Sequence, residues 1–455
     1  TNWQSYGGET TMSHFSQMVA LTYQNFVSAA VGIAVCAAVV RGIARNESSS
    51  IGNFWSDLVR ITLYVLLPLS IIGALIMLWQ GMVQNFDAGV TESVGGHPVV
   101  EDSVKAGAQL AQTLKTLFEN SGRPLFNVNA AHPFENPTAL ASFLQSFYIL
   151  IIPSALVFFL WDAVGSRRHA WTVWAVMLAL FIGGVLWIYF SELHGTHLLQ
   201  QIAGGAVPNM EGKEVRLGAG ATALWSIVTT VTSNGSVNGM HDSTMPISGL
   251  MEMLNMQINT WFGGVGVGWM NYFTFIIIAV FISGLMVGRT PEFLCHKVEA
   301  REMKVASIVA LLHPFVILVG TALAAYLYVH APAFVENEGG WLNNPGFHGL
   351  SEMLYEFTSV AANNGSGFEG LGDNTWFWNY ACGIVLILSR FIPIVGQVAI
   401  AGLLASKKYI PESAGTLKTD TVTFSVMTFA VIFIVAALSF FPVHALSTIA
   451  EHFSL

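Results

Sequence analysis

Four short polar turns recur along a chain that is otherwise strongly apolar. Their amide and hydroxyl side chains and glycines are suited to presenting oxygen dipoles to a cation in place of its hydration water. Irregular backbone at membrane depth is tolerated only where it is buried in protein or lines a cavity. The sequence therefore predicts a four-walled filter for a monovalent cation, built from the turns Thr1-Asn2-Trp3-Gln4-Ser5-Tyr6-Gly7-Gly8, Asn120-Ser121-Gly122, Ser233-Asn234-Gly235-Ser236 and Asn363-Asn364-Gly365-Ser366.

An ordinary loop turn is the alternative for any single Asn-Gly pair. Glycine permits the unusual backbone angles that a carbonyl cage needs, and Asn, Ser and Thr side chains anchor such turns. The last three turns each follow a half-length helical segment, namely Lys105–Phe118, Ala219–Thr232 and Gly349–Ala362. This shared context favours a filter over unrelated loops.

The composition predicts a polytopic helical membrane protein. Hydrophobic residues make up 53% of the 455 residues and charged residues 10%, whereas a soluble protein carries roughly 25% charge. Eight segments with at most one charge approach or exceed the roughly 20 residues that span a bilayer. They are Ser16–Val40, Ile61–Val83, Ala139–Trp161, Thr172–Ser191, Trp269–Val287, Val305–Val329, Trp376–Ala405 and Thr421–Leu446.

The cysteines and histidines lack the spacing of a disulfide framework or a metal site. We therefore expect the three cysteines to be small apolar residues and the histidines to be structural. The residues concerned are Cys36, Cys295 and Cys382, and histidines such as His14, His132, His241 and His313.

The distribution of the 18 lysines and arginines predicts the orientation. Most of them fall into four segments, which the positive-inside rule assigns to the cytoplasm. The long loops Gln84–Val104, His194–Gly218 and His330–His348 are then outside. The four basic segments contain Arg41, Arg45 and Arg60; Arg167 and Arg168; Arg289, Lys297, Arg301 and Lys304; and Lys407, Lys408 and Lys418.

This orientation predicts a repeat of span, pore helix, filter turn and span, a pseudo-fourfold and potassium-channel-like architecture. The chain starts inside the first turn, so we expect the outer span and pore helix of the first unit to lie upstream. The expected parts are 1–50, the end of repeat 1; 51–166, repeat 2; 167–303, repeat 3 with a broken inner helix; 304–408, repeat 4; and 409–455, a C-terminal transmembrane helix.

The inner helix of the third unit is interrupted by glycines. Met245–Phe262 is only partly apolar, and the run Gly263-Gly264-Val265-Gly266-Val267-Gly268 separates it from the next apolar helix. Glycine runs break helices. We expect a discontinuous helix with an intramembrane loop beneath the filter, as in transporters; a re-entrant kink with a packing role is the alternative.

One arginine, Arg390, lies within an expected span. An intramembrane arginine costs at least about 2.5–3.5 kcal/mol at the bilayer centre and is a functional hypothesis by default. We expect a positive plug below the filter that stops passive leak; snorkelling or a structural ion pair is the alternative. Glu9, Glu135 and Asp242 follow three of the turns, where they either concentrate cations or bind loop backbone.

With these residues in place, the chain resembles the KdpA family, the channel-like subunits of Kdp potassium-transporting P-type ATPases. The matching stretches are spread over the whole chain: Asn2–Glu9, Asn127–Pro137, Met240–Ser243, Thr290–Leu294 through Arg301–Lys304, and Ala361–Ser366.

The resemblance implies a potassium-binding and translocating subunit, related to the Trk, Ktr and HKT transporters, in a bacterial plasma (inner) membrane. It implies K⁺ as the transported ion and no other cofactor. The implied partners are an ATP-hydrolysing P-type subunit, a single-span periplasmic subunit and a small accessory peptide within the lipid bilayer, with no nucleic acid. It also implies that Gly263, Gly264, Gly266 and Gly268 form a gate loop, that Arg390 is the cytoplasmic-side arginine, and that Phe275 lies along a tunnel.

The second turn departs from the family pattern. Family members typically have Asn-Gly-Gly-Gly before Phe-Phe-Asn, whereas this chain has Asn120-Ser121-Gly122-Arg123-Pro124-Leu125-Phe126-Asn127. A cation beside a cation path is repelled by several kcal/mol in a low-dielectric pore. Either Arg123 points outward to solvent or transport is impaired.

Three classes of function remain to be distinguished. The first is the ion-binding subunit of an ATP-driven potassium pump, which is not an enzyme alone because it has no DKTGT or GxxxxGK[ST] motif. The second is a self-sufficient channel or cation symporter of the same architecture, against which the broken helix and Arg390 argue. The third is an intramembrane enzyme, for which the spans supply no converging nucleophile and base or metal set.

Overall fold

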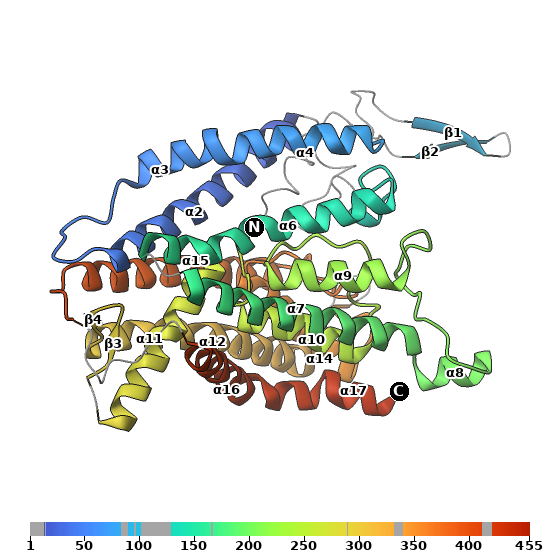
Figure 1. Ribbon diagram of the computed structural model, residues 1–455. Coiled ribbons are helices and arrows are strands. Elements are labelled where there is room, and N and C mark those ends of the chain that lie inside the picture. The colour runs from blue at the N-terminus through green and yellow to red at the C-terminus, as the bar shows by residue number, and fades with distance from the viewer. Residues whose placement is uncertain are drawn as a thin grey trace.

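The computed structural model describes residues 13, 15–82, 90–94, 97–101, 129–164, 167–288, 290–331, 340–411 and 421–455. Its helices form an elongated bundle with two small β-hairpins at opposite ends (Figure 1). The elements before the third turn are η1 (Ser16–Leu21), α2 (Thr22–Ala44), α3 (Phe54–Ile61), η2 (Thr62–Leu66), α4 (Leu67–Trp79), β1 (Val90–Val94), β2 (His97–Glu101), η3 (Asn129–Ala131), α6 (Ala139–Val164), α7 (Arg167–His194), α8 (His197–Ala203) and α9 (Gly218–Val231).

The elements after the third turn complete the bundle. They are α10 (Pro246–Ile258), α11 (Val267–Val287), β3 (Glu292–Phe293), β4 (His296–Lys297), α12 (Ala300–His330), α14 (Phe347–Ala362), α15 (Trp376–Ala405), α16 (Val422–Leu446) and α17 (Thr448–Ser454).

Eight of the described helices are long and apolar enough to cross a membrane, as the sequence predicts. Local capping chemistry fixes where several of these helices begin. The second span was expected at Ile61–Val83, but it runs over Phe54–Trp79 because the Asn53 side chain accepts a hydrogen bond from the Ser56 N–H and starts the helix earlier. Thr375 and Thr421 cap α15 and α16 in the same way.

The two β-hairpins are additions that the all-α prediction did not contain. β1 and β2 pair antiparallel within the loop expected outside, and β3 and β4 pair within a connection expected inside. The C-terminal span also breaks at Ser447, where α16 ends and α17 begins. The all-α class stands, because neither hairpin joins the helical bundle into a larger sheet.

The inner helix of the third unit is discontinuous, as predicted. It consists of α10 and α11, with an eight-residue connection, 259–266, between them. Pro246 starts α10 at a position where its missing N–H costs nothing. The left-handed residue Asn259 (φ 45°) ends it.

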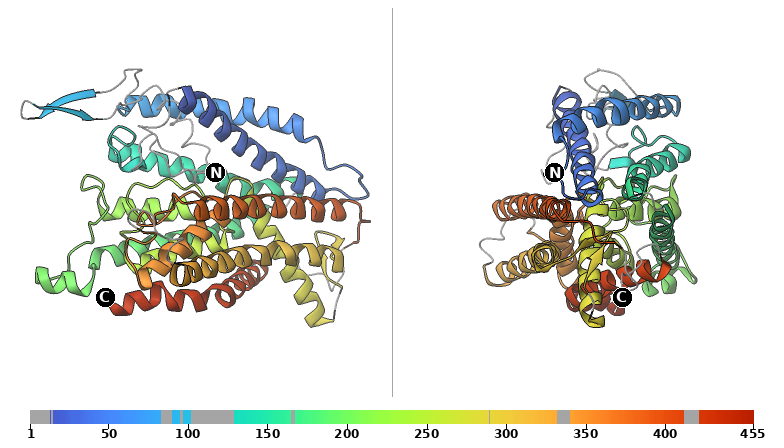
Figure 2. Two further views of the ribbon diagram at one scale, coloured as in Figure 1. Left: turned by 180° about the vertical axis from the view of Figure 1, so that it is seen from behind. Right: turned by 60° about the vertical axis from the view of Figure 1, so that its left-hand side comes forward.

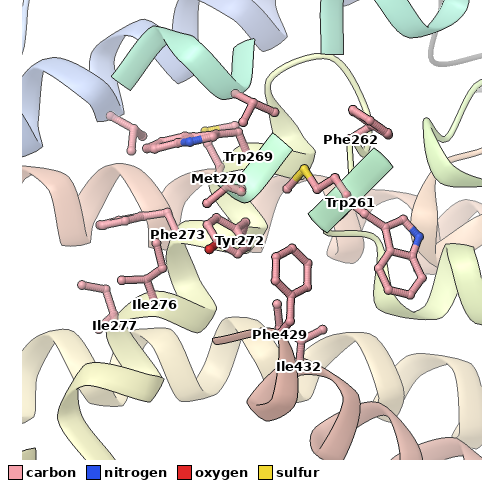
Figure 3. Close-up of a cluster of buried hydrophobic side chains, with 14 of the residues drawn as sticks. Trp261, Phe262, Trp269, Met270, Tyr272, Phe273, Ile276, Ile277, Phe429 and Ile432 are labelled. Atoms are coloured by element: carbon pink, nitrogen blue, oxygen red, sulfur yellow. The ribbon is translucent and has the colours of Figure 1, made fainter. Parts of the chain in front are cut away.

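A cluster of large apolar side chains anchors the connection and α11 (Figure 3). Trp269 and Phe273 stack with ring centroids 5.8 Å apart, and Tyr272 of α11 packs against Phe429 of α16 at 5.5 Å. Burying side chains of this size contributes about 1.5–3 kcal/mol each. The broken helix is therefore held by packing on both sides of its break.

The two half-length helices lie inside the bundle. Nearly every residue of α14 is buried, and so is most of α9. α10 packs against both, α12 and α15 cover α14, and α6 and α7 cover α9. Figures 1 and 2 show α3 and α4 on the opposite side of the bundle from α16 and α17. This arrangement carries the ends of α9 and α14, and the polar turns that follow them, into the interior.

Candidate ion-binding site

The third and fourth polar turns have the same backbone conformation. Ser233 and Asn363 each follow a half-length helix with φ 53°, and the glycines two residues later, Gly235 and Gly365, have φ 89° and 113°. Positive φ is strained for residues with a Cβ and natural for glycine. The predicted need for glycine at the third position of both turns therefore has a direct backbone cause.

Matching hydrogen bonds hold both turns to the helix before them. The Asn234 N–H donates to the Thr229 carbonyl (3.0 Å) and the Gly235 N–H to the Thr229 hydroxyl (2.8 Å). In the fourth turn Ser359 has the same role, accepting from Asn364 at its carbonyl (2.9 Å) and from the Gly365 N–H at its hydroxyl (3.3 Å).

The asparagine at the centre of each turn is fixed through its own side chain. The Oδ1 of Asn234 accepts from the Ser236 N–H (3.0 Å), and the Oδ1 of Asn364 accepts from the Ser366 N–H (2.8 Å). The N–H groups of both turns are thus directed at the scaffold, so cation coordination falls to oxygen atoms. This donor arrangement suits a cation and not an anion.

The two turns meet each other. A Cβ added to Gly235 would lie 2.3 Å from the carbonyl oxygen of Asn364 and 2.9 Å from the Cα of Gly365. The side-chain amide of Asn364 (Nδ2) also donates to the Thr229 carbonyl across the contact (2.8 Å). Two of the four expected walls therefore converge, while the other candidates, Thr1–Gln4 and Asn120–Gly122, lie outside the described residues, as do Lys105–Phe118, Arg123 and Glu9.

The connection between α10 and α11 is bonded to the third turn. The Ser233 hydroxyl lies 3.1 Å from Oδ1 of Asn259, and the Gly263 N–H donates to the Val231 carbonyl (2.8 Å). Asn271 of α11 donates to the Asn259 carbonyl (3.0 Å). A movement of the connection 259–266 would therefore strain or break hydrogen bonds that hold the third turn.

The glycines of the connection between α10 and α11 allow other backbone segments to pack closely against it. A Cβ on Gly263 would lie 2.1 Å from the Cα of Gly268, and a Cβ on Gly266 would lie 2.3 Å from the carbonyl oxygen of Gly32 in α2. The Gly264 carbonyl accepts from the Gly268 N–H (3.0 Å). The packing role that the sequence left open is therefore real, and it is compatible with a gating role.

A cavity of about 80 Å³ adjoins the fourth turn and this connection. About 10–15 Å³ accommodates one water molecule by this measure, so several fit. Asn363, Arg390 and Phe275 line the cavity, and further polar groups come from Asn259, Asn271, His313 and Gln397.

Arg390 extends from α15 to the fourth turn, where its Nε donates to Oδ1 of Asn363 (3.2 Å). Within the described part of the chain no carboxylate oxygen lies within salt-bridge distance of its guanidinium, so the ion-pair alternative has no partner there. The guanidinium thus lies beside a polar cavity and bonds the fourth turn, and its role as a positive plug stays a prediction.

A second polar network lies beyond the two turns. His241, in the segment after the third turn, has its Nδ1 2.6 Å from the Tyr355 hydroxyl, and that hydroxyl lies 2.8 Å from the hydroxyl of Ser366 in the fourth turn. Burial, helped by Lys213, lowers the pKa of His241 to about 3, so the imidazole is neutral. The network ties the two turns together on the side away from Arg390.

His348 at the start of α14 is charged. Burial lowers its pKa, but hydrogen bonds to Asp242 (2.9 Å) and Glu451 (2.7 Å) outweigh burial and raise the pKa to about 10. Asp242 thus binds an imidazole, which neither alternative from the sequence anticipated. Burial and Asp242 also raise the pKa of nearby Glu352 to about 7.

A comparison with protein families agrees with this geometry. The family described as "KdpA: Potassium-transporting ATPase A subunit" matches residues 1–453. The chain belongs to the KdpA family. Membership and the eight apolar helices together make it a multi-pass membrane protein.

Curated relatives in the KdpA family are similar over the whole chain. A potassium-transporting ATPase potassium-binding subunit of Phocaeicola vulgatus is 63% identical, and the match covers 100% of this chain and 80% of the relative. Proteins of the same description from Bacteroides thetaiotaomicron and Flavobacterium psychrophilum are 62% and 51% identical, each with the same coverage.

Sequence reasoning missed several polar residues of this KdpA chain. Gln397 and Asn271 bond each other across the cavity (2.8 Å), beside His313, which was expected only as a structural residue. Their signal was available, because polar side chains inside spans are expensive and mark functional sites. His348 gave no such signal, since its partners come from distant segments.

Proposed function

We propose that this chain is the potassium-binding and translocating subunit of an ATP-driven K⁺ uptake complex, and that it hydrolyses no ATP itself. The observation that carries the proposal is the contact between two turns of identical hydrogen-bonding design above a polar cavity. Family membership supports it, because curated KdpA relatives are described as potassium-binding subunits.

Selectivity would arise from the oxygen atoms of the turns. K⁺ loses its hydration shell only where dipoles replace it at similar energy, and carbonyl rings do this in potassium filters. The hydrogen bonds of Thr229 and Ser359 hold the turns in position before the ion arrives. The expected first and second walls would complete the ring, in a pseudo-fourfold repeat with units at 1–50, 51–166, 167–303 and 304–408.

The cavity would receive the ion below the filter. Several waters fit within it, and Asn271, Gln397 and Phe275 line it. Arg390 would raise the energy of a cation there and so oppose passive leak, while the Gly263–Gly268 loop would act as the gate. A self-sufficient channel is disfavoured, because an arginine at this place opposes a freely open pore.

The ion would then pass to a partner. A subunit of a potassium-transporting ATPase requires an ATP-hydrolysing P-type subunit, and we extend the proposal to a single-span periplasmic subunit and a small accessory peptide. We propose K⁺ as cargo and no other cofactor. The basic ends of α2 and α15, near Arg41, Arg45 and Lys407, would face the cytoplasm of a bacterial inner membrane.

The test is a glycine substitution in the contact between the turns. Gly235→Ala places a Cβ 2.3 Å from the Asn364 carbonyl, and Gly235→Asp adds a carboxylate. Overpacking of this kind costs about 1–3 kcal/mol, so we expect the K⁺ concentration for half-maximal ATPase activity of the full complex to rise about 10- to 100-fold. Other cations should begin to stimulate it, most clearly in the aspartate variant.

Gly402→Ala in α15 is the matched control, because a Cβ there meets no atom within 4 Å. Assembly of each variant is checked by the subunit ratio of the purified complex. Unchanged K⁺ dependence and selectivity in an assembled Gly235→Ala complex would refute the filter assignment.

A further inference from the structure

Three side chains at the start of α14 converge from two segments of the chain. His348 and Glu352 are one helical turn apart on the same face, and Asp242 follows the third turn. One ligand atom from each residue lies within 4.8 Å of those of the other two. The Nε2 of His348 is 2.9 Å from Asp242 Oδ1 and 3.9 Å from Glu352 Oε1.

These separations lie close to those between two ligands of one divalent transition-metal ion. Zn²⁺ binds imidazole nitrogen and carboxylate oxygen at about 2.0–2.2 Å, so two ligand atoms on one tetrahedral ion are about 3.2–3.6 Å apart. Small shifts of the Asp242 and Glu352 side chains would bring both distances into that range. Two carboxylates and one imidazole also leave a fourth position for water.

The ring of His348 is held in the orientation that such a ligand needs. Its Nδ1 lies 2.7 Å from Glu451 Oε1 of α17, and its face stacks on Phe368 with an interplanar angle of 10°. A metal-bound histidine almost always donates its other N–H to a carboxylate or carbonyl, which fixes the tautomer. Glu451 supplies that carboxylate and leaves Nε2 for the metal.

Glu352 is the independent sign of a missing cation. Its side chain is fully buried, and its Oε2 has no hydrogen-bond partner within the described part of the protein. A Cβ added to Gly370 would lie 2.6 Å from Asp242 Oδ2 and 2.8 Å from Glu352 Oε1, so both carboxylates flank this glycine without a side chain between them. A buried carboxyl group is either protonated or paired with a cation, and the imidazole of His348 lies at hydrogen-bond distance from Asp242 but 3.9 Å from Glu352.

We propose that His348, Asp242 and Glu352 bind one divalent transition-metal ion of the Zn²⁺ class at the outer end of the bundle. The metal takes the lone pair of Nε2, and the proton that Nε2 carries in the metal-free state leaves to water. The proton on Nδ1 stays and is donated to Glu451. The site is separate from the cavity beside Arg390 and does not depend on how K⁺ is selected.

The bound ion would link the segment that follows the third turn to the helix that precedes the fourth turn. Asp242 belongs to the segment after the third turn, Glu352 belongs to the helix that leads into the fourth, and Glu451 belongs to the C-terminal helix. Metal binding should therefore stabilise the packing of these three segments against one another.

The experiment measures metal content of the full complex, purified with its affinity tag removed and equilibrated in a Zn²⁺ buffer. We expect about one tightly held Zn²⁺ per copy of this chain, lost in His348→Gln and in Asp242→Asn. His197→Gln, which changes an exposed histidine of α8, is the matched control and should keep the metal. Zn²⁺ should raise the thermal midpoint of wild type and His197→Gln only.

Two results would overturn the proposal. One is a wild-type complex that holds no Zn²⁺ beyond the level of Mg²⁺-equilibrated protein. The other is a His348→Gln or Asp242→Asn complex that retains the same Zn²⁺ and the same thermal shift. If His348→Gln fails to assemble, Asp242→Asn decides by the same two readouts, and K⁺-stimulated ATPase activity identifies complexes that are intact.

Discussion

The third and fourth turns have matching φ angles and matching hydrogen bonds, yet they rest on different supports. Below the third turn the chain runs into α10, breaks at 259–266 and resumes as α11. Below the fourth turn a single helix of 30 residues, α15, continues without a break and carries Arg390. One wall of the site thus bonds to an irregular backbone connection, and the other bonds to a fixed charge.

This difference separates two tasks that a transport filter must combine. Both turns need the same backbone to present oxygens to an ion. Under the proposed function the third unit would supply the gate, because glycine permits backbone conformations that other residues rarely adopt. A barrier to leak needs a charge held in place, which a continuous helix supplies better than a loop.

The largest effect on this comparison should come from Arg390→Gln. A cation about 8 Å from an arginine is repelled by about 2 kcal/mol at an effective dielectric constant of about 20. Removing the charge should therefore raise passive K⁺ entry into the cavity about 30-fold. The measurement is ATP-independent K⁺ flux into liposomes that contain the full complex.

Arg390→Lys is the control, because it keeps a positive charge on the same helix. It should keep the membrane tight, even though it loses the geometry of the bond to Asn363. A Gln variant that leaks no more than the Lys variant would show that Arg390 positions the fourth turn and carries no barrier.

A smaller effect should come from Tyr355→Phe, which tests whether the two turns act as one unit. The phenol hydroxyl joins His241 after the third turn to Ser366 in the fourth. Its loss removes two buried hydrogen bonds at about 0.7 kcal/mol each, so we expect about a tenfold higher half-maximal K⁺ concentration. Tyr380→Phe, an exposed tyrosine of α15, is the matched control.

Different effects of Tyr355→Phe on thermal stability and on K⁺ dependence would show whether the third and fourth turns are coupled. If Tyr355→Phe changes thermal stability while K⁺ dependence stays as in Tyr380→Phe, the network is structural and the turns respond to ions separately.

The sequence was sufficient for the parts of the fold that depend on local pattern. Eight apolar runs predicted the eight spans, and the glycine run predicted the break after α10. These features follow from chain length across a bilayer and from the backbone freedom of glycine.

Contacts between segments far apart in the chain could not be predicted from local sequence pattern. Arg390 was recognisable as unusual, but its partner Asn363 is 27 residues away and depends on how α15 packs beside α14. His348 meets Asp242 and Glu451 from segments more than 100 residues away in either direction. A histidine of this kind has no local pattern, so only tertiary packing identifies it.

The smallest effect should come from Ser233→Ala, which removes a side-chain bond between the third turn and the connection 259–266. The hydroxyl lies 3.1 Å from Oδ1 of Asn259, and alanine, like serine, carries a Cβ, so the substitution adds no atom at this positive-φ position. A single neutral hydrogen bond contributes about 0.5–1.5 kcal/mol, so K⁺ dependence of the ATPase should shift about two- to tenfold. A double-mutant cycle with Asn259→Ala isolates this bond: coupling of at least about 0.5 kcal/mol supports a mechanical link from gate to turn. Additive effects would mean that the Ser233–Asn259 hydrogen bond does not couple the broken helix to the third turn. The two turns would then differ only in the charge of Arg390 beside the fourth.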